Sequence, residues 1–412
     1  MQEQHTIEKE DAQREGILVP LDLPDFRICQ QQWQDDGTIC VVIIARTTQV
    51  CCPQCQQMCT KVHDRRARKK RDLPCQAHQM ELILLKRRFR CDTCDTVFTE
   101  PDTVCGWRRR TTRRLRQYIG KQALTQPLSE VGSSLQVGTR FVQTCFQSVL
   151  QEELKHKGMP VDEEQALPSP RFLGIDEFAR RKGHIYDTIL CDLVKRSVLE
   201  VSEGRTLEDV CRLLGRLKDP KAVEAVSMDM SASFRPAVER CLPHAQIVVD
   251  HFHVIQHVMK AFRKTVSSWA HKKEGMILLH RKQRLFLKAK EDLTAEEEQA
   301  RAQIGLQLPL LEQAWRLKED LRDWYATATT ETAANQLDHW IEQVKASACD
   351  PLKKALSAFG RWREEILAFF EYRISNGFVE GKNNRTKMMM RRSYGFKNRQ
   401  HLRLRILAGN LR

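Results

Sequence analysis

The sequence has no long hydrophobic run: nothing in its 412 residues approaches the roughly 20 consecutive apolar residues that a membrane-spanning helix needs. Its opening residues, MQEQHTIEKEDAQREG, are polar and acidic, unlike the apolar stretch of a secretory signal peptide. Internal repeats and low-complexity tracts are also lacking. We therefore expect an intracellular, cytoplasmic protein without a membrane partner.

The chain is strongly basic, with 68 Lys and Arg against 53 Asp and Glu and a formal net charge of +15. The basic residues crowd into the first third, in runs from Lys61 to Arg71 and from Arg108 to Arg114. Such an excess favours a polyanionic partner, with nucleic acid ahead of an anionic membrane surface.

Four of the 15 cysteines form two CxxC pairs, Cys52–Cys55 and Cys91–Cys94, with 35 residues between the pairs. In a reducing compartment, clustered thiols indicate metal binding rather than disulfides. Four thiolates suit a tetrahedral Zn²⁺ ion, and a site closed in this way is structural because no position is left for a substrate. We predict that zinc stiffens a basic hairpin whose side chains contact DNA phosphates.

The cysteine spacing leaves alternatives open. The gap is longer than in the usual zinc ribbon, although residues 80–90 read as a strand that leads into the second pair. Cys51, Cys59 or Cys105 could replace one of the four ligands, and unligated core thiols would give the same pattern.

Residues 124–146 fit a helix-turn-helix, with apolar positions at helical spacing on either side of a Val137–Gly138 turn. The second helix starts at Thr139. Its outer face would present three polar side chains to a DNA groove: Arg140, Gln143 and Thr144. A plain helical hairpin would have the same apolar pattern.

Beyond a Pro-rich link at 167–170, strands and helices alternate. We predict strands at 172–175, 185–194, 197–202, 222–228 and 245–249, and helices from 206 and at 234–242. Three strands, a helix, a strand, a helix and a strand is the order of a ribonuclease-H-like core.

Three acidic residues stand where such a core would bring them together. We expect Asp176 to close the first strand, Asp229 to close the fourth, and Glu380 to lie near the start of a helix. The first and fourth strands are neighbours, so the aspartates would lie side by side. Oxygen ligands of this kind bind Mg²⁺ or Mn²⁺, and two such ions support in-line phosphoryl transfer. Each carboxylate taken alone could equally be a solvated loop residue or a helix cap.

A fourth acidic residue, Asp250, ends the fifth strand, and His253 follows three positions later on the same side of a starting helix. The pair could orient the metal site, contact DNA or form a structural Asp–His hydrogen bond.

Several segments together resemble the ISL3 family of bacterial insertion-sequence transposases. They are CPQC…RFRCDTC, the helix-turn-helix, FLGIDEFARRKGHIYDTILCDL, VSMDMSASFRPAVERCLPHAQIVVDHFHV and ISNGFVEGKNNRTKMMMRRSYGFKNRQHLRLRIL. The similarity covers nearly the whole chain from about residue 50. It implies a DDE transposase whose catalytic acids are Asp176, Asp229 and Glu380, with Asp250 and His253 as an auxiliary DxxH motif.

The sequence pattern and the resemblance together predict a multidomain α+β and α/β protein. Its parts would be a polar leader at 1–24, a zinc-ribbon DNA-binding domain at 25–106, a helix-turn-helix domain at 107–158, a ribonuclease-H-like catalytic domain at 171–253 plus 373–412, and a helical insertion at 254–372. The tryptophans of the insertion could stack on flipped bases or pack in its core.

The implied partner is double-stranded DNA, both the terminal inverted repeats of an insertion sequence and a target, bound by a homodimer or larger assembly. The residues expected to contact DNA outside the recognition helix are Arg87, Arg88, Lys382, Arg385, Lys387, Arg391 and Arg392. The competing hypotheses are a non-catalytic DNA-binding regulator derived from a transposase, and a host nuclease that acts on RNA–DNA hybrids or junctions.

Overall fold

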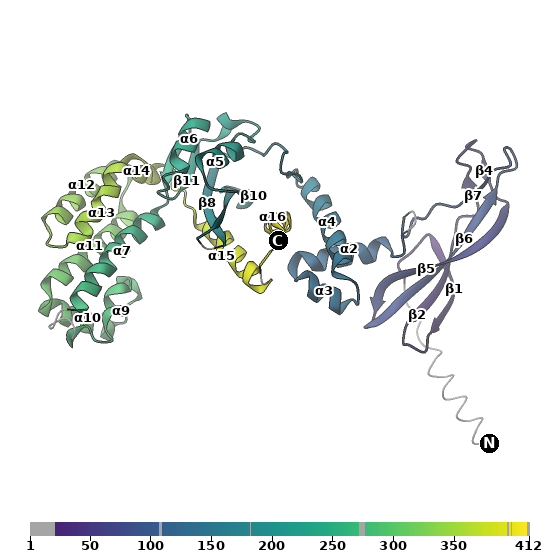
Figure 1. The fold of residues 1–412 in the computed structure, drawn as a ribbon, viewed down its shortest axis with the longest axis horizontal. Coiled ribbons are helices and arrows are strands. Elements are labelled where there is room, and N and C mark those ends of the chain that lie inside the picture. The colour runs from purple at the N-terminus through teal and green to yellow at the C-terminus, as the bar shows by residue number, and fades with distance from the viewer. Residues whose placement is uncertain are drawn as a thin grey trace, which may run out of the picture. The chain divides into compact units, whose positions relative to one another are not determined.

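The computed structural model describes residues 21–106, 109–181, 183–271, 277–393, 395–396 and 398–409. Most of the predicted leader, and Arg108 at the start of the second basic run, lie outside these residues. The chain divides into two compact units, Met1–Glu153 and Leu154–Arg412 (Figure 1). Within the described part of the chain, no helix is both long enough and apolar enough to cross a membrane.

The first unit is built on a twisted sheet with the strand order β1–β2–β6–β5, and a short strand β7 also pairs with β6 (Figure 1). The strands are β1 Phe26–Trp33, β2 Ile39–Ala45, β5 Val62–Cys75, β6 His78–Arg90 and β7 Val97–Thr99. Side chains alternate across a strand, so every second residue of β2 and β6 faces the core. These buried residues are Ile39, Val41, Ile43, Met80, Leu82 and Leu84. The strand predicted at 80–90 is confirmed.

Three helices complete this unit: α2 Arg113–Thr125, α3 Leu128–Ser134 and α4 Thr139–His156. Thr112 caps α2 by accepting a hydrogen bond from the Leu115 amide. Helices α2 and α4 approach closely at Gly120, where a Cβ would lie 2.4 Å from the Val149 side chain. The helices predicted on either side of the Val137–Gly138 turn are therefore present and packed.

The second unit contains a five-stranded sheet with the order β10–β9–β8–β11–β12. Its strands are β8 Phe172–Arg181, β9 Ile185–Asp192, β10 Ser197–Glu203, β11 Ala225–Met228 and β12 Gln246–Val249. The first three strands are antiparallel, whereas β11 runs parallel to both β8 and β12. The helices between them, α5 Leu207–Leu214 and α6 Phe234–Cys241, start close to the predicted positions, and Thr206 caps α5 in a capping box with Asp209.

Several strand boundaries were predicted wrongly. Strand β11 begins at Ala225 rather than at 222, because Pro220–Ala222 form a 3-10 helix, and β9 ends at Asp192 rather than at 194. Strand β8 does not end at Asp176 but continues to Arg181, because its antiparallel pairing with β9 extends that far. The parallel pairing of β8 with β11, in contrast, ends at Gly174 opposite Ser227. Asp176 therefore lies within a strand, at the point where its neighbour on the β11 side stops.

The described residues between 251 and 372 form a helical block, comprising α7 His251–Ala270, α9 Gln283–Leu287, α10 Ala295–Gln307, α11 Pro309–Thr327, α12 Thr330–Ala346, α13 Asp350–Arg361 and α14 Arg363–Tyr372. Its tryptophans pack in the core. Trp315, Trp324, Trp340 and Trp362 are buried, and the indoles of Trp324 and Trp340 donate hydrogen bonds to backbone carbonyls. These four side chains are thus not free to stack on DNA bases.

Two further helices, α15 Gly377–Arg392 and α16 Arg399–Ala408, follow the helical block. Helix α16 is fixed to β10 by a buried ion pair, in which the Arg403 guanidinium donates to both oxygens of Glu200 at 2.6 and 2.8 Å. Arg216 also reaches Glu200, at 2.8 Å. The two guanidinium groups around the buried Glu200 carboxylate hold α16 against the edge of the sheet.

Candidate functional site

Three aspartates lie in a row across the second unit's sheet. Gly174 of β8 is opposite Ser227 of β11, which places Asp176 beside Asp229. Met228 is in turn opposite Val249 of β12, which places Asp229 beside Asp250. The parallel register of these strands therefore gathers three carboxylates at one edge.

Two of these carboxylates, Asp176 and Asp229, have raised pKa values. Burial raises the pKa of Asp176, although the Glu177 amide, which donates to Asp176 Oδ1 at 2.8 Å, opposes the shift. Burial also raises the pKa of Asp229 to about 6, and the negative charge of Asp176 adds to that increase. A bound cation would reduce the electrostatic repulsion between carboxylates held together in this way.

Helix α15 brings Glu380 to the same edge. The side-chain amide of Asn376, at the start of the helix, donates to the Ile175 carbonyl at 2.9 Å. The side-chain amide of Asn383 donates to Asp176 Oδ2 at 2.7 Å. Asn376, Glu380 and Asn383 are spaced four and three residues apart, so they share one helix face. Burial raises the pKa of Glu380, His253 opposes the increase, and the negative charge of Asp250 adds to it.

Asn376 and Asn383 were not among the predicted site residues. Their spacing around Glu380 was visible in the sequence and could have identified them. Both are buried, and they bond to β8 rather than to their own helix. They therefore position α15 and one of the carboxylates.

The close approach of α15 to β8 depends on Gly174. A Cβ at this position would lie 2.7 Å from Leu193 Cδ2, 2.8 Å from Val379 Cγ2 and 3.1 Å from Asn376 Oδ1. Backbone and helix are in contact here because glycine has no side chain.

We expect Gly174→Ala to lower the free energy of unfolding by about 1–3 kcal/mol, the usual cost of overpacking a close-packed core. Urea denaturation of the purified variant measures the change. Gly360→Ala is the matched control, since Gly360 lies in α13, where a Cβ would meet nothing within 4 Å, and alanine there should be neutral or stabilising. Equal stabilities for the two variants would contradict the packing described.

Asp250 and His253 complete the group. Asp250 immediately precedes α7 and is fully buried, and His253 lies in the first turn of that helix. His253 Nε2 is 3.4 Å from Glu380 Oε1. Potential ligand atoms of Asp250, His253 and Glu380 all lie within 4.8 Å of one another. The positive charge that His253 can carry lowers the pKa of both Asp176 and Asp229, although burial outweighs it.

Several polar atoms of this group are buried and have no hydrogen-bond partner among the described residues. They are Asp229 Oδ1, Asp250 Oδ1 and Oδ2, His253 Nε2, Asn376 Oδ1 and Asn383 Oδ1. Buried polar atoms rarely remain unsatisfied in folded proteins. A cluster of oxygen and imidazole acceptors without donors fits divalent cations as the missing partners.

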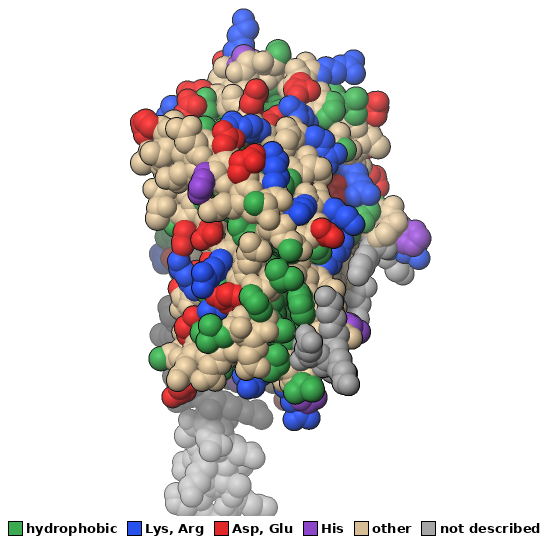
Figure 2. Space-filling view, turned by 90° about the vertical axis from the view of Figure 1, so that its left-hand side faces the viewer, with side chains coloured by type: hydrophobic (Ala, Val, Ile, Leu, Met, Phe, Trp, Pro, Cys, Tyr) green, Lys and Arg blue, Asp and Glu red, His purple; other side chains and the backbone are tan. Residues whose placement is uncertain are grey.

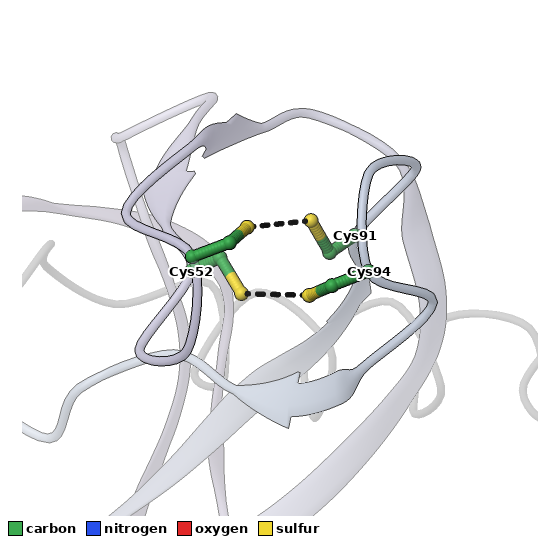
Figure 3. A group of neighbouring side chains, drawn as sticks. Cys52, Cys91 and Cys94 are labelled. Atoms are coloured by element: carbon green, nitrogen blue, oxygen red, sulfur yellow. Dashed lines mark hydrogen bonds between the residues drawn. The ribbon is translucent and has the colours of Figure 1, made fainter.

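The predicted cysteines also come together, at the end of the first unit's sheet. Cys52 Sγ lies 3.6 Å from Cys94 Sγ, and Cys55 Sγ lies 3.4 Å from Cys91 Sγ (Figure 3). A tetrahedral zinc site with bonds of about 2.3 Å separates its sulfurs by about 3.8 Å, so the four thiols are close to that arrangement. Backbone N–H groups, of Cys94 first, lower the pKa of Cys91 to about 6, which favours the thiolate that binds metal.

The alternative cysteine ligands fit less well. Cys105 lies in the separate core of the sheet, and the Cys51 thiol is directed at the Gln56 carbonyl, 3.2 Å away. Cys59 is buried beside the four cysteines, in the hairpin of β3 Val50–Cys51 and β4 Met58–Cys59. The grouping of Cys52, Cys55, Cys91 and Cys94 matches the predicted set.

One residue predicted to contact DNA is not available for that role. Arg87 is buried and its guanidinium donates to Glu100 Oε2 at 2.7 Å, so the prediction for Arg87 was wrong. Arg88 is half-buried and bonded to Asp64 at 2.9 Å. On the neighbouring strand β5, Arg65 and Arg68 are exposed.

The remaining predicted contact residues lie on helix surfaces. On α4, Arg140 and Thr144 are exposed and Gln143 is half-buried. On α15, Arg385, Lys387, Arg391 and Arg392 are exposed, whereas Lys382 is half-buried and donates to the Gly409 carbonyl at 3.2 Å. In contrast, the face in Figure 2, which shows the left-hand side of Figure 1, mixes basic and acidic side chains and has no patch of a single sign.

Comparison with known proteins assigns both units to one family. The sequence model of the ISL3 transposases, described as "Transposase", matches residues 173–406, and a model described as "zinc-finger of transposase IS204/IS1001/IS1096/IS1165" matches residues 48–94. The chain belongs to the ISL3 transposase family. The first match includes the five acidic and histidine residues gathered at the sheet edge, and the second includes both cysteine pairs.

Two named relatives support the assignment to the ISL3 transposases. The transposase for insertion sequence element IS1001 of Bordetella parapertussis is 26% identical over 394 residues, which covers 92% of this chain and 95% of the relative. The transposase for insertion sequence element IS1557 of Mycobacterium tuberculosis is 25% identical over 260 residues, which covers 56% of this chain and 58% of the relative. The similarity to the IS1001 protein thus extends through both units.

Proposed function

We propose that the chain is an active DNA transposase that binds the terminal inverted repeats of an insertion sequence and catalyses metal-dependent strand cleavage and transfer. The observation that carries the proposal is the convergence of Asp176, Asp229 and Glu380 at one sheet edge. The strand order β10–β9–β8–β11–β12 supports a ribonuclease-H-like core around them. In this account, residues 171–253 and 373–412 form the catalytic domain and 254–372 its helical insertion.

The donor set fits Mg²⁺ or Mn²⁺ at the carboxylates and Zn²⁺ at the cysteines. Two divalent cations, when bound, activate the attacking oxygen and stabilise the leaving oxygen of an in-line phosphoryl transfer. The protein's own residues supply the alignment. Asn383 orients Asp176, Asn376 fixes the start of α15, and Gly174 allows that helix to carry Glu380 to the edge.

The first unit supplies the proposed recognition of double-stranded DNA. Arg65 and Arg68 of β5, which have no ion-pair partner among the described residues, are placed to contact phosphates, and Arg88 joins them if it leaves Asp64. The α3–α4 pair acts as a helix-turn-helix, with Arg140, Gln143 and Thr144 towards the bases. On α15, Lys382, Arg385, Lys387, Arg391 and Arg392 hold the DNA near the carboxylates. Pairing of two ends calls for a homodimer or larger assembly.

A donor-plasmid experiment tests the proposed function. A marker flanked by the element's own ends should move to new sites in bacterial cells that express the protein, and a marker flanked by shuffled ends should not. Occupancy of the ends without any movement would favour the alternative, a non-catalytic regulator derived from a transposase.

We expect Arg140→Ala to weaken binding to the element ends by about tenfold, because a lost base contact typically costs about 1–3 kcal/mol. Competition binding assays with specific and shuffled DNA measure the change. The control is Arg27→Ala, which removes an exposed arginine of β1 and should alter affinity less than about twofold. If Arg140→Ala weakened both DNAs equally, the residue would contact the backbone rather than the bases.

A further inference from the structure

The position of Asp250 and His253 goes beyond the three catalytic carboxylates. We propose that both are direct ligands, together with Glu380, of one of the two divalent cations, while Asp176 and Asp229 hold the other. This inference rests on the proposed function, because it concerns the composition of the same metal centre. It changes the donor set from carboxylates alone to carboxylates and one imidazole nitrogen.

The first argument is the gathering of the three side chains from separate elements. Asp250 follows β12, His253 lies one turn later on α7, and Glu380 comes from α15, yet their ligand atoms lie within 4.8 Å of one another. The sheet register also puts Asp250 directly beside Asp229. Each of two cations bound at this end of the sheet would thus have aspartate ligands, Asp176 and Asp229 for one and Asp250 for the other.

The second argument is the unsatisfied state of Asp250. Its side chain has no exposed surface, and neither carboxylate oxygen has a hydrogen-bond partner among the described residues. It stands at the N-cap position of α7, where an aspartate side chain usually accepts hydrogen bonds from the helix amides, but the side chain of Asp250 accepts none. A buried charge of this kind persists only when a partner compensates it.

A purely structural role for the pair finds no support in the hydrogen bonds of the described part of the chain. The side chains of Asp250 and His253 do not bond to each other, and His251 Nδ1 is 3.4 Å from the Asp250 carboxylate without forming a hydrogen bond. The Nε2 atom of His253 lies instead towards Glu380, at 3.4 Å, and has no hydrogen-bond partner there either. The ligand atoms of His253 and Glu380 therefore face each other from two helices, as two ligands of one cation would.

An imidazole nitrogen has a chemical consequence. Mg²⁺ prefers an octahedral shell of oxygens, whereas Mn²⁺ accepts nitrogen ligands more readily. We therefore expect the wild-type protein to favour Mn²⁺ over Mg²⁺, and this preference to fall when His253 is replaced by an oxygen donor.

Pulsed electron paramagnetic resonance of Mn²⁺ tests the assignment on the full-length, zinc-loaded protein without DNA. The wild type should show coupling of Mn²⁺ to a ¹⁴N nucleus, and His253→Gln should lose it. Asp250→Asn should weaken Mn²⁺ binding by at least about tenfold. The matched control is His257→Gln, since His257 lies one turn further along α7, 3.3 Å from the Ala355 carbonyl, and should leave the coupling unchanged.

Absence of the nitrogen coupling in Mn²⁺-loaded wild type, its survival in His253→Gln, or a failure to bind Mn²⁺ would each overturn the assignment. These results are independent of DNA cleavage. Nitrogen coupling without transposition would support the metal centre and contradict the proposed function. Transposition without nitrogen coupling would support the proposed function and contradict the metal centre.

Discussion

Glu380→Gln is expected to reduce cleavage of element-end DNA by at least about a thousandfold while leaving DNA affinity unchanged. The substitution keeps the size of the side chain but replaces a charged cation ligand by a neutral amide. Groups that act together on a transition state show losses of this order or larger when one is removed. Binding should persist because the proposed DNA-reading residues lie in the first unit and on the exposed surface of α15.

Single-turnover cleavage of a labelled DNA end, measured beside its binding affinity, gives both quantities. The control variant is Glu371→Gln, which removes an exposed carboxylate from α14 and should cleave at the wild-type rate. If Glu380→Gln retained more than about a tenth of the wild-type rate, Glu380 would not be a metal ligand in the reaction.

Cys91→Ser should release the zinc ion and weaken binding to the element ends. Structural zinc contributes on the order of 10 kcal/mol to the folding of small zinc modules, so loss of one ligand is not tolerated locally. The effect should remain local, because the cysteine cluster and the core between β2 and β6 are separate groups of buried residues. We therefore expect the cysteine loops to unfold while the sheet persists.

Metal analysis of the purified variant and hydrogen exchange of the two CxxC loops measure these outcomes. Cys29→Ser is the control, since Cys29 is an exposed thiol on β1 and its loss should change neither zinc content nor binding. Full zinc content in Cys91→Ser would show that another thiol completes the site. The candidate is Cys59, which is buried in the same cluster.

The strands and helices of the second unit were largely predictable, because their signals are local. Apolar runs marked β9 to β12, and Thr206 marked the start of α5. The end of β8 was not predictable from its own residues, since Asp176 looks like a strand terminus in the sequence. Strand β8 continues past Asp176 only because β9 pairs with it as far as Arg181.

Side-chain partners distant in sequence were the main source of error in the candidate site. Arg87 sits in a basic segment that reads as a DNA contact, and only the folding of Glu100 against β6 reveals that its charge is neutralised. The unsatisfied state of Asp250 likewise depends on burial, which the sequence does not display. In contrast, the two CxxC pairs predicted the grouping of the four cysteines, although their spacing left Cys51, Cys59 and Cys105 open as alternatives.

Incubation of the purified wild-type protein with a labelled DNA that carries the element end and its flank tests the central claim most directly. The account predicts cleavage at the element boundary with Mg²⁺ or Mn²⁺ and none with a chelator or with a shuffled end. Specific binding without cleavage in either metal would contradict it and would leave a DNA-binding regulator as the function of the chain.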